Sequence, residues 1–423
     1  MRFLHAADLH LDSPLRGLAR RDDAPHARLR GATRSAVAKL VDFALTNGVD
    51  FLLLCGDLFD GDWPDFHTGL YFREQMARLA RADVPVFIVN GNHDAASVIT
   101  RHLALPPNVT VFESRRAHTV EIERLGVALH GRSFGTRHTD EDLVPSYPPP
   151  VPGRFNIGLL HTSLNGRPPH DPYAPTTRAT LVAQGYDYWA LGHVHTREVV
   201  SESPRIVYPG NLQGRWASES GPKGCELVDV DEDHRIRTEF IALDTVRWHD
   251  LRIDVTMLSD AGALESALGD VLAAACADDA ERLHAVRVTL AGASDLHPLE
   301  AAEPGRLDAT VRSAAQDRAG VDLWIEQVRL EIDPPPRASG LAATILERDD
   351  AVGELAVLAA EFRADPGCLG ALTEALAGPL LDRLPADVRA RIAASLPTDP
   401  DTHRRLVDDA LATALAVLDS GRA

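Results

Sequence analysis

Three apolar segments that each run into a polar loop constrain the fold of this chain more than any other feature. They occupy residues 1–11, 49–59 and 84–94, and stretches with apolar residues at helical spacing separate them, at about 27–47 and 66–82. Short apolar strands that alternate with helices are typical of a parallel sheet that is buried on both faces. Because the carboxyl ends of parallel strands face one crevice, we expect the three loops to converge on one site.

The pattern changes between residues 108 and about 243, where short strands separated by turns replace the helices. The predicted strands lie at residues 108–114, 127–134, 155–164, 186–195, 205–211, 224–231 and 235–243. Two proline-dense segments in this part, residues 146–153 and 165–177, are expected to lie on the surface. The second segment is either a loop that contacts substrate or a plain connector.

A smaller unit follows residue 243, with the order strand, helix, strand, helix, strand, and the proline run 334–336 ends it. The remaining residues are rich in alanine and leucine and read as several helices. We therefore predict three domains, at residues 1–244, 245–335 and 336–423. A length of 423 residues is consistent with two or three domains.

The composition is that of a globular protein, with 45% hydrophobic and 25% charged residues, which excludes a disordered or fibrous chain. No apolar run approaches the ~20 residues that span a bilayer, and charged residues interrupt the first residues where a signal peptide needs an apolar stretch. The expected location is the cytoplasm. The four cysteines form no CxxC pair and are expected to be reduced.

The formal net charge of -19 argues at first against a nucleic-acid partner, because phosphate binding usually requires a basic surface. The acidity is unevenly distributed, however. Residues 1–244 hold 26 basic and 31 acidic side chains, whereas residues 245–423 hold 17 and 31. DNA contact by the first domain therefore remains open, and the acidic C-terminal part suits a protein partner better than DNA.

Five clusters in the first 195 residues concentrate carboxylate, amide and imidazole side chains, each at the end of an apolar strand. Any one of them alone is more often structural, but five in this order favour a functional site. Two clusters each contain a pair of side chains two residues apart, Asp8 with His10 and His193 with His195. This spacing places both members of a pair on one face of a strand. Nitrogen and oxygen donors without thiolates are typical of manganese, iron or zinc in a hydrolytic site. The clusters are Asp8 with His10, Asp57, Asn92-His93-Asp94, His161, and His193 with His195.

These clusters carry a resemblance to a known family. The series DLH, GDLFD, GNHD, LLHTS and GHVH resembles the calcineurin-like metallophosphoesterases. The flanking DLHLDSP and YPGNLQGR look like the SbcD-type DNA repair exonucleases, in particular their YhaO-like bacterial branch. The resemblance covers residues 1–244 and, more loosely, the unit after them. It implies an α/β fold: a four-layer αββα sandwich followed by a small α/β capping domain and a helical C-terminal region.

The resemblance also implies two divalent metal ions, with Mn²⁺ expected first and Fe²⁺, Zn²⁺ or Mg²⁺ as alternatives. Two ions that share a carboxylate activate a bridging hydroxide and hold the attacking and leaving oxygens of a phosphoryl transfer. The implied ligands of one ion are Asp8, His10, Asp57 and His195. Those of the other are Asp57, Asn92, His161 and His193.

His93 resembles the catalytic histidine of the family, which stabilises charge on the phosphate and protonates the leaving alkoxide. The neighbouring Asp94 either orients His93 or caps the helix that follows it. Arg215, within GNLQGR, is the best candidate for a phosphate contact. Asp60 stands where the best-studied SbcD-type nucleases have a histidine that positions the phosphate for 3′-to-5′ exonuclease activity. Metal binding is expected to tolerate this departure, which YhaO-like members share.

The expected function is therefore two-metal hydrolysis of DNA phosphodiester bonds, as an exonuclease or endonuclease. The alternatives are a metallophosphoesterase that acts on nucleotides or a phosphoprotein, and a structural subunit without significant turnover. The GDxVDRG and GNHE motifs of the related protein phosphatases are absent. The resemblance further implies an SMC-like, SbcC-type coiled-coil ATPase as partner, bound through helices after residue 338. A homodimer is left open, and no membrane association is expected.

Overall fold

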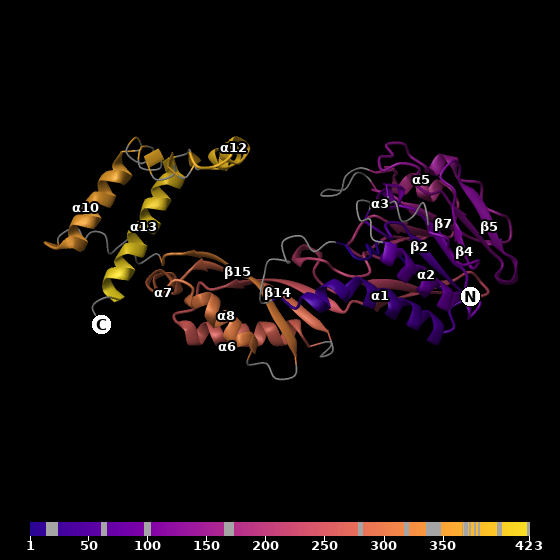
Figure 1. Cartoon of the computed structure of the whole chain (residues 1–423), viewed down its shortest axis with the longest axis horizontal. Helices are drawn as coiled ribbons and strands as arrows, with labels where there is room; N and C mark the ends of the chain where they lie inside the picture. The colour runs from indigo at the N-terminus through magenta and orange to yellow at the C-terminus, as the bar shows by residue number, and fades with distance from the viewer. Residues whose placement is uncertain are drawn as a thin grey trace. The chain divides into compact units, whose positions relative to one another are not determined.

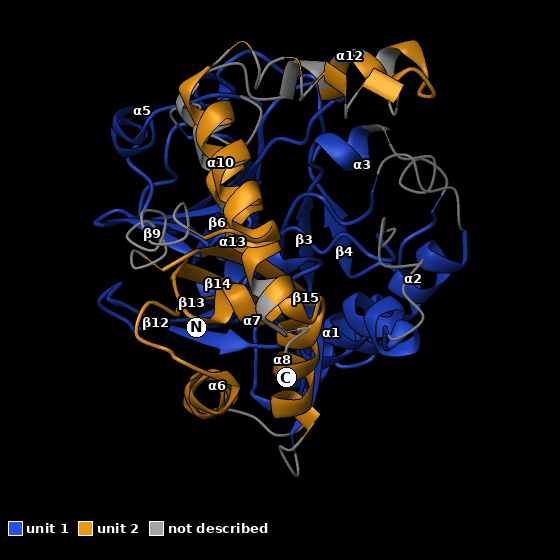
Figure 2. Cartoon of the chain, turned by 90° about the vertical axis from the view of Figure 1, so that its left-hand side faces the viewer, with its two compact units in different colours: residues 1–250, 278–286, 320–326 blue, residues 251–277, 287–319, 327–423 orange. Residues whose placement is uncertain are grey.

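The structure is a computed structural model of the chain. It describes all residues except 14–23, 61–65, 97–102, 165–172, 278–281, 317–320, 336–347, 366, 368–370, 372–373, 376–377, 380, 396–399 and 421–423. The chain forms two compact units (Figure 2). Unit 1 comprises residues 1–250, 278–286 and 320–326, and unit 2 comprises the rest. Within the described residues, no helix is both long enough and apolar enough to cross a membrane.

The first sheet of unit 1 has six strands, in the order β12-β11-β1-β2-β3-β4. Its strands β1 to β4 are parallel, as the three apolar segments predict. The helices α1 and α2 cover one face of this sheet with side chains such as Val37, Leu40 and Phe72. The elements are β1 (Arg2–Ala6), β2 (Phe51–Cys55), β3 (Val86–Val89), β4 (Val109–Val111), β11 (Gly224–Val230), β12 (Ile236–Ala242), α1 (His26–Thr46), α2 (Phe66–Ala80) and α3 (Asn92–Ala96).

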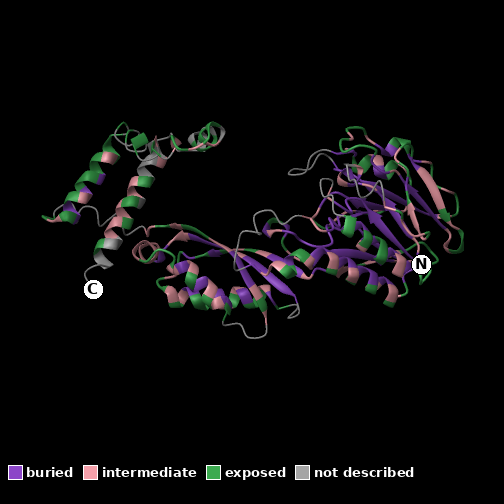
Figure 3. Ribbon diagram, in the orientation of Figure 1, coloured by how far each residue is buried: buried purple, intermediate pink, exposed green. Residues whose placement is uncertain are grey.

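The second sheet also has six strands, in the order β5-β6-β7-β8-β10-β9. The two sheets face each other across a core in which the Phe3 ring stacks on Phe51 at 4.9 Å and meets Tyr188 edge-on at 5.4 Å. The inner strands are accordingly buried, whereas the helices expose one face (Figure 3). The elements are β5 (His118–Ile122), β6 (Val127–Gly131), β7 (Phe155–His161), β8 (Tyr188–Gly192), β9 (Glu198–Glu202), β10 (Arg205–Tyr208) and α5 (Arg178–Ala183).

This architecture confirms the expected metallophosphoesterase sandwich, with differences in detail. The strands β5 and β9 were not predicted, because both are half-exposed and carry polar residues between their apolar ones. The segment 165–177 was expected on the surface, and its residues 165–172 lie outside the described chain. Tyr173 and Ala174 are instead buried, in an apolar cluster with Leu160 and Trp189.

The third sheet has the order β13-β14-β15. Its elements follow the predicted alternation, with one unpredicted short helix, α7. The division between the two compact units falls inside the three strands, after Asp250, Val286 and Glu326. The predicted domain limits at 244 and 335 stay predictions. The elements are β13 (Val246–Asp254), α6 (Ala261–Ala275), β14 (Leu283–Ala293), α7 (Leu296–Ala302), α8 (Arg306–Gln316) and β15 (Asp322–Asp333).

The C-terminal part is helical, as predicted (Figure 1). It contains α10 (Ala351–Ala364), α12 (Ala386–Ser395) and α13 (Pro400–Ser420). Val352 and Ala356 of α10 are buried against Leu415 of α13. Asp350 caps the start of α10, because its side chain accepts hydrogen bonds from the N–H groups of Val352 and Gly353.

Candidate metal centre

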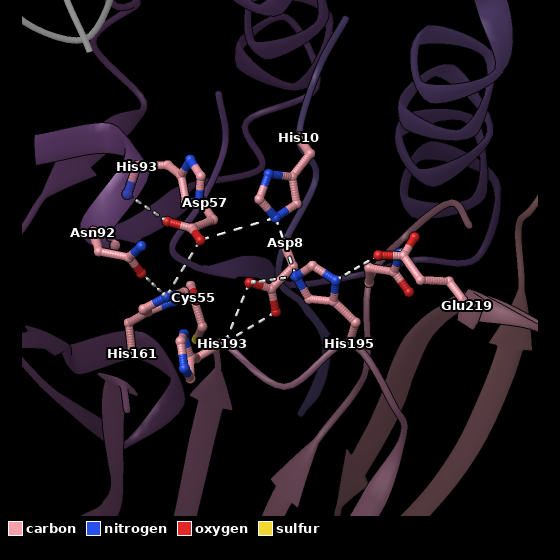
Figure 4. Close-up of polar contacts among 12 residues, drawn as sticks. Asp8, His10, Cys55, Asp57, Asn92, His93, His161, His193, His195 and Glu219 are labelled. Atoms are coloured by element: carbon pink, nitrogen blue, oxygen red, sulfur yellow. Dashed lines mark hydrogen bonds and ion pairs between the residues drawn. The ribbon is translucent and has the colours of Figure 1, made fainter. Parts of the chain in front are cut away.

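The loops that carry the predicted ligands meet at the carboxyl ends of β1, β2, β3, β7 and β8 (Figure 4). The loop after β1 runs beside the loop after β2, because the Asp8 N–H donates to the Gly56 carbonyl and the His10 N–H to the Asp57 carbonyl, both at 3.0 Å. His161 is the last residue of β7, and His193 follows β8 directly. The parallel strands thus bring five distant sequence clusters to one place.

The backbone at these loop positions is unusual. Asp8, His10, Asp57 and His193 all have left-handed backbone angles, with φ of 52°, 41°, 52° and 102°. Such conformations cost on the order of 1–3 kcal/mol each for a residue other than glycine and cluster at functional sites. The fold therefore holds these four side chains where local preference alone would not place them.

Glycines immediately before the ligands permit the close approach of the loops. A Cβ atom on Gly192 would lie 1.8 Å from the Cys55 carbonyl oxygen. Gly56 has a φ of +85°, and a Cβ there would lie 2.3 Å from Nδ1 of His161. The sequence pattern GD, GN and GH before three ligands is thus a packing requirement of the site.

The Asp57 carboxylate lies between two groups of histidines. Its Oδ2 is 3.9 Å from Nε2 of His10 and 3.5 Å from Nε2 of His161. Asp8 completes the cluster, with Oδ1 at 4.0 Å from Nε2 of His195. In each of three sets, three donor atoms lie within 4.8 Å of one another. The first set is Asp8, His10 and His195, the second is Asp8, Asp57 and His161, and a further set at the rim is His10, Asp60 and His93.

A carboxylate holds the outer nitrogen of each histidine in the first set. Nδ1 of His10 lies 2.7 Å from Asp60, and Nδ1 of His195 lies 2.7 Å from Glu219. Because a carboxylate accepts, each Nδ1 carries the proton, and both Nε2 atoms present lone pairs to the centre. These two Nε2 atoms are 3.2 Å apart. Two lone pairs at that distance repel each other unless a cation lies near both.

Arg215 connects the two carboxylates. Its Nη2 donates to Glu219 at 2.9 Å, and its Nη1 lies 3.8 Å from Asp60. The guanidinium also stacks on the Trp216 ring at 4.6 Å, and the side chain is only 8% exposed. We term Asp60, Arg215 and Glu219 the outer carboxylate network.

The second set is held by the main chain instead. Nδ1 of His161 donates to the Cys55 carbonyl at 2.9 Å, so its Nε2 faces Oδ1 of Asn92 at 3.1 Å. The His193 N–H donates to the Asp8 carboxylate at 3.0 Å, and the His193 ring packs edge-on against His161 at 5.2 Å. Every predicted ligand therefore lies in or against this cluster.

Burial and neighbouring charges shift the pKa values of the site. Burial raises the pKa of Asp8 to about 6 and lowers that of His10 to about 4. Burial also opposes charge on Asp57 and on His161, but their mutual attraction outweighs it. The pKa of Asp57 is consequently well below its usual range, and that of His161 rises to about 9. Without a cation the centre keeps a proton on His161.

His93 lies at the rim. Its backbone N–H donates to Asp57 at 3.0 Å, its side chain is 32% exposed, and its Nδ1 lies 3.6 Å from Asp60. Neither expected role of Asp94 is found among the described residues, which exclude 97–102. Its carboxylate accepts hydrogen bonds from the N–H groups of Leu58, Phe59 and Gly91, and it joins the loops after β2 and β3. In the described chain no hydrogen bond connects Asp94 to the His93 ring.

Arg215 and Asp60 were predicted to contact substrate. The structure places both beside the predicted ligands, where they hold Glu219 and His10, and their contact with substrate stays a prediction. Sequence reasoning missed Glu219 and Lys223, whose Nζ donates to the His195 carbonyl at 2.8 Å. The only signal was their position, a few residues after the GNLQGR motif.

Comparison with known proteins identifies the family. Residues 1–197 match the calcineurin-like phosphoesterase family, and residues 248–333 match the middle domain of metallophosphoesterase YhaO. The chain is 34% identical to metallophosphoesterase YhaO of Bacillus subtilis over 335 residues, which is 78% of this chain and 81% of that protein. The chain belongs to the calcineurin-like metallophosphoesterases.

More distant relatives carry a more specific name. The DNA double-strand break repair protein Mre11 of Methanopyrus kandleri is 23% identical over 275 residues, which is 58% of each chain. Mre11 of Sulfurisphaera tokodaii is 25% identical over 248 residues, 55% of this chain and 60% of that protein. This metallophosphoesterase therefore spans about three fifths of the Mre11 proteins that it matches.

The residues fit the dinuclear metal site of this family. Nδ1 of His10, His195 and His161 is held by an outward acceptor, so Nε2 of each faces the centre, where the carboxylates of Asp8 and Asp57 supply negative charge. Neutral imidazole together with carboxylate and amide oxygen suits divalent manganese, iron or zinc. The carboxylates behind the histidines fix their tautomers, as outer partners do in many metal sites.

Proposed function

We propose that this metallophosphoesterase hydrolyses phosphodiester bonds in DNA, with two divalent ions held by the predicted ligands. The observation that carries the proposal is the position of the Asp57 carboxylate, within 3.5–3.9 Å of histidine nitrogens on both sides. The Mre11 relatives support DNA as the substrate. The metal pair would supply charge stabilisation and an activated water for attack on phosphorus.

The side chains of this protein would donate the proton, bind the ions and orient the ligands. His93 is the general acid in this proposal, because its ring is partly exposed at the rim and can reach a leaving oxygen. Asp60 lies 3.6 Å from that ring and would limit its rotation. Buried Asp8 and Asp57 would hold the ions, and the outer carboxylate network would keep His10 and His195 aimed at them.

We propose Mn²⁺ as the metal, since the donor set contains no thiolate and combines imidazole with oxygen ligands.

The test uses purified protein freed of metal by a chelator and then supplied with Mn²⁺, Zn²⁺ or Mg²⁺. Linear and circular DNA, single- and double-stranded, serve as substrates. Degradation or nicking that requires Mn²⁺ and disappears in His93→Ala is the expected result.

The same assay separates the alternatives. Hydrolysis of mononucleotides or a phosphopeptide without action on DNA would replace DNA by a smaller substrate. Full metal loading without any hydrolysis would favour a structural subunit.

We further propose that the C-terminal helices dock a coiled-coil ATPase of the SMC-like class. In support, α10 and α13 leave Val357, Leu358 and Leu406 between 45% and 48% exposed although the two helices pack together. Deletion of residues 338–423 should abolish binding of that ATPase and leave hydrolysis of a small phosphodiester intact. Binding at full affinity after the deletion would refute the proposal.

A further inference from the structure

A pocket of about 360 Å³ lies in unit 1 outside the cluster of predicted ligands. The loops after β4 and β6 form much of its wall, with Ser114, Arg132, Phe134, Gly135, His138 and Glu141 among the lining residues. This volume is within the range of pockets that hold small organic ligands, about 300–1,000 Å³. None of these residues has a role in the centre described above.

The pocket wall is joined directly to the loop that carries Asn92. The Asn90 N–H donates to Oγ of Ser133 at 2.9 Å, and the Phe134 N–H donates to the Asn90 carbonyl at 3.0 Å. The Phe134 ring then packs edge-on against the ring of His161 at 5.6 Å. One wall of the pocket is thus one side chain away from a predicted metal ligand.

A second wall reaches His193. The His138 ring lies 5.2 Å from the Tyr173 ring, which packs edge-on against His193 at 5.7 Å. The Thr139 carbonyl accepts a hydrogen bond from Ala174, whose own carbonyl accepts one from Thr162, the residue after His161. The pocket therefore adjoins the half of the centre that His161 and His193 form.

The charges of the pocket select the kind of group that fits there. The Arg132 guanidinium donates to Glu141, to Ser146 and to the Ser114 carbonyl, so its charge is already neutralised. Asp140 adds a further carboxylate to the lining. A second phosphate is disfavoured in such a pocket, whereas an uncharged group with hydroxyl and amide functions finds hydrogen-bond partners.

We propose that this pocket binds the nucleoside attached to the phosphate that is hydrolysed. The proposal rests on the proposed phosphodiesterase function and adds a specificity site to it. Phe134 of the pocket wall contacts His161, so a nucleoside in the pocket would lie beside a phosphate held at the centre. A nucleoside is uncharged and carries the hydroxyl and base-edge groups that the pocket accommodates.

The experiment compares two esters that release the same 4-nitrophenol, methyl 4-nitrophenyl phosphate and thymidine 4-nitrophenyl phosphate. The thymidine ester is used as both its 3′ and 5′ isomers. The ratio of kcat/KM between nucleoside ester and methyl ester measures the contribution of the pocket, with Mn²⁺ saturating. We expect a ratio on the order of tenfold or more for at least one isomer.

Substitutions that fill the pocket should remove this preference. A Cβ on Gly135 would lie 3.5 Å from the Ser114 side chain, an ordinary contact, so Gly135→Phe places its ring across the pocket. Ser114→Phe adds a ring from the neighbouring position in the pocket wall. The matched control is Gly31→Phe on α1, where a Cβ meets nothing within 4 Å. Both filled variants should lower the ratio toward one, and the control should retain it.

The outcomes separate this inference from the proposed function. Unchanged ratios in both filled variants, with the methyl ester still hydrolysed, would overturn the nucleoside pocket alone. A wild-type ratio near one for both isomers would also overturn it. Failure of the wild-type protein to hydrolyse either ester would instead count against the phosphodiesterase function. Loss of the preference for one isomer only would support the pocket and show which side of the phosphate it serves.

Discussion

The two halves of the metal centre hold their histidines in different ways. In the half with His10 and His195, the carboxylates of Asp60 and Glu219 fix the outer nitrogens. In the half with His161, a main-chain carbonyl at Cys55 does so. In the first half the orientation of the histidines therefore depends on side chains that a single substitution can remove. In the second half it depends on a main-chain carbonyl, which a substitution does not remove. The difference predicts which substitutions affect metal binding.

The largest effect is expected at Asp57, whose carboxylate lies within 3.5–3.9 Å of a histidine nitrogen in each half. Asp57→Asn should lower activity by more than about a hundredfold, because the loss of outer partners alone typically costs about 10- to 100-fold. Metal titration followed by calorimetry should show weakened binding at both halves. The control is Asp42→Asn, on the surface of α1. Loss of only one metal equivalent in Asp57→Asn would place Asp57 in one half instead of between them.

The next largest effect concerns the outer carboxylate network. Glu219→Gln should weaken one metal equivalent by about 10- to 100-fold and leave the other unchanged, since the amide no longer favours a proton on Nδ1 of His195. Asp60→Asn should act in the same direction through His10. Glu232→Gln, on the exposed turn between β11 and β12, is the matched control. Equal weakening of both metal equivalents would contradict the claim that these carboxylates orient the histidines of one half only.

Proton release distinguishes the halves without any substitution. The metal-free pKa is about 9 for His161 and about 4 for His10. At pH 7 metal binding must therefore displace a proton from His161 and none from His10. We expect about one proton released by the equivalent that binds at His161, and an affinity there that rises with pH up to about 9. Calorimetry in buffers of different ionisation enthalpy measures this. Equal proton release by both equivalents would contradict it.

The smallest effect is expected from Phe134→Leu. The ring contacts His161 edge-on, but the hydrogen bond to the Cys55 carbonyl remains and continues to orient the imidazole. Metal affinity should change by less than about threefold, while the free energy of unfolding falls by about 1 kcal/mol, because the side chain is buried and slightly smaller. A tenfold loss of affinity would show that aromatic packing, and not the main chain, holds this half.

Much of unit 1 follows from local sequence pattern. The apolar segments that became β1, β2 and β3 were recognisable because a strand buried on both faces has no polar residue to interrupt it. The strands β5 and β9 were not recognised, since half-exposed strands mix polar and apolar residues. The helix α7 was also missed, and its seven residues are too few to establish a period.

The sequence by itself determined the donor side chains and their proximity. Parallel strands place their carboxyl ends at one edge, so Asp8, Asp57 and Asn92 had to meet there. Only the tertiary structure decided how those side chains are held. Glu219 and Arg215 come from a segment far along the chain, and nothing in local periodicity shows that they reach His195 and Asp60. Contacts between distant segments depend on packing, which a local pattern does not encode.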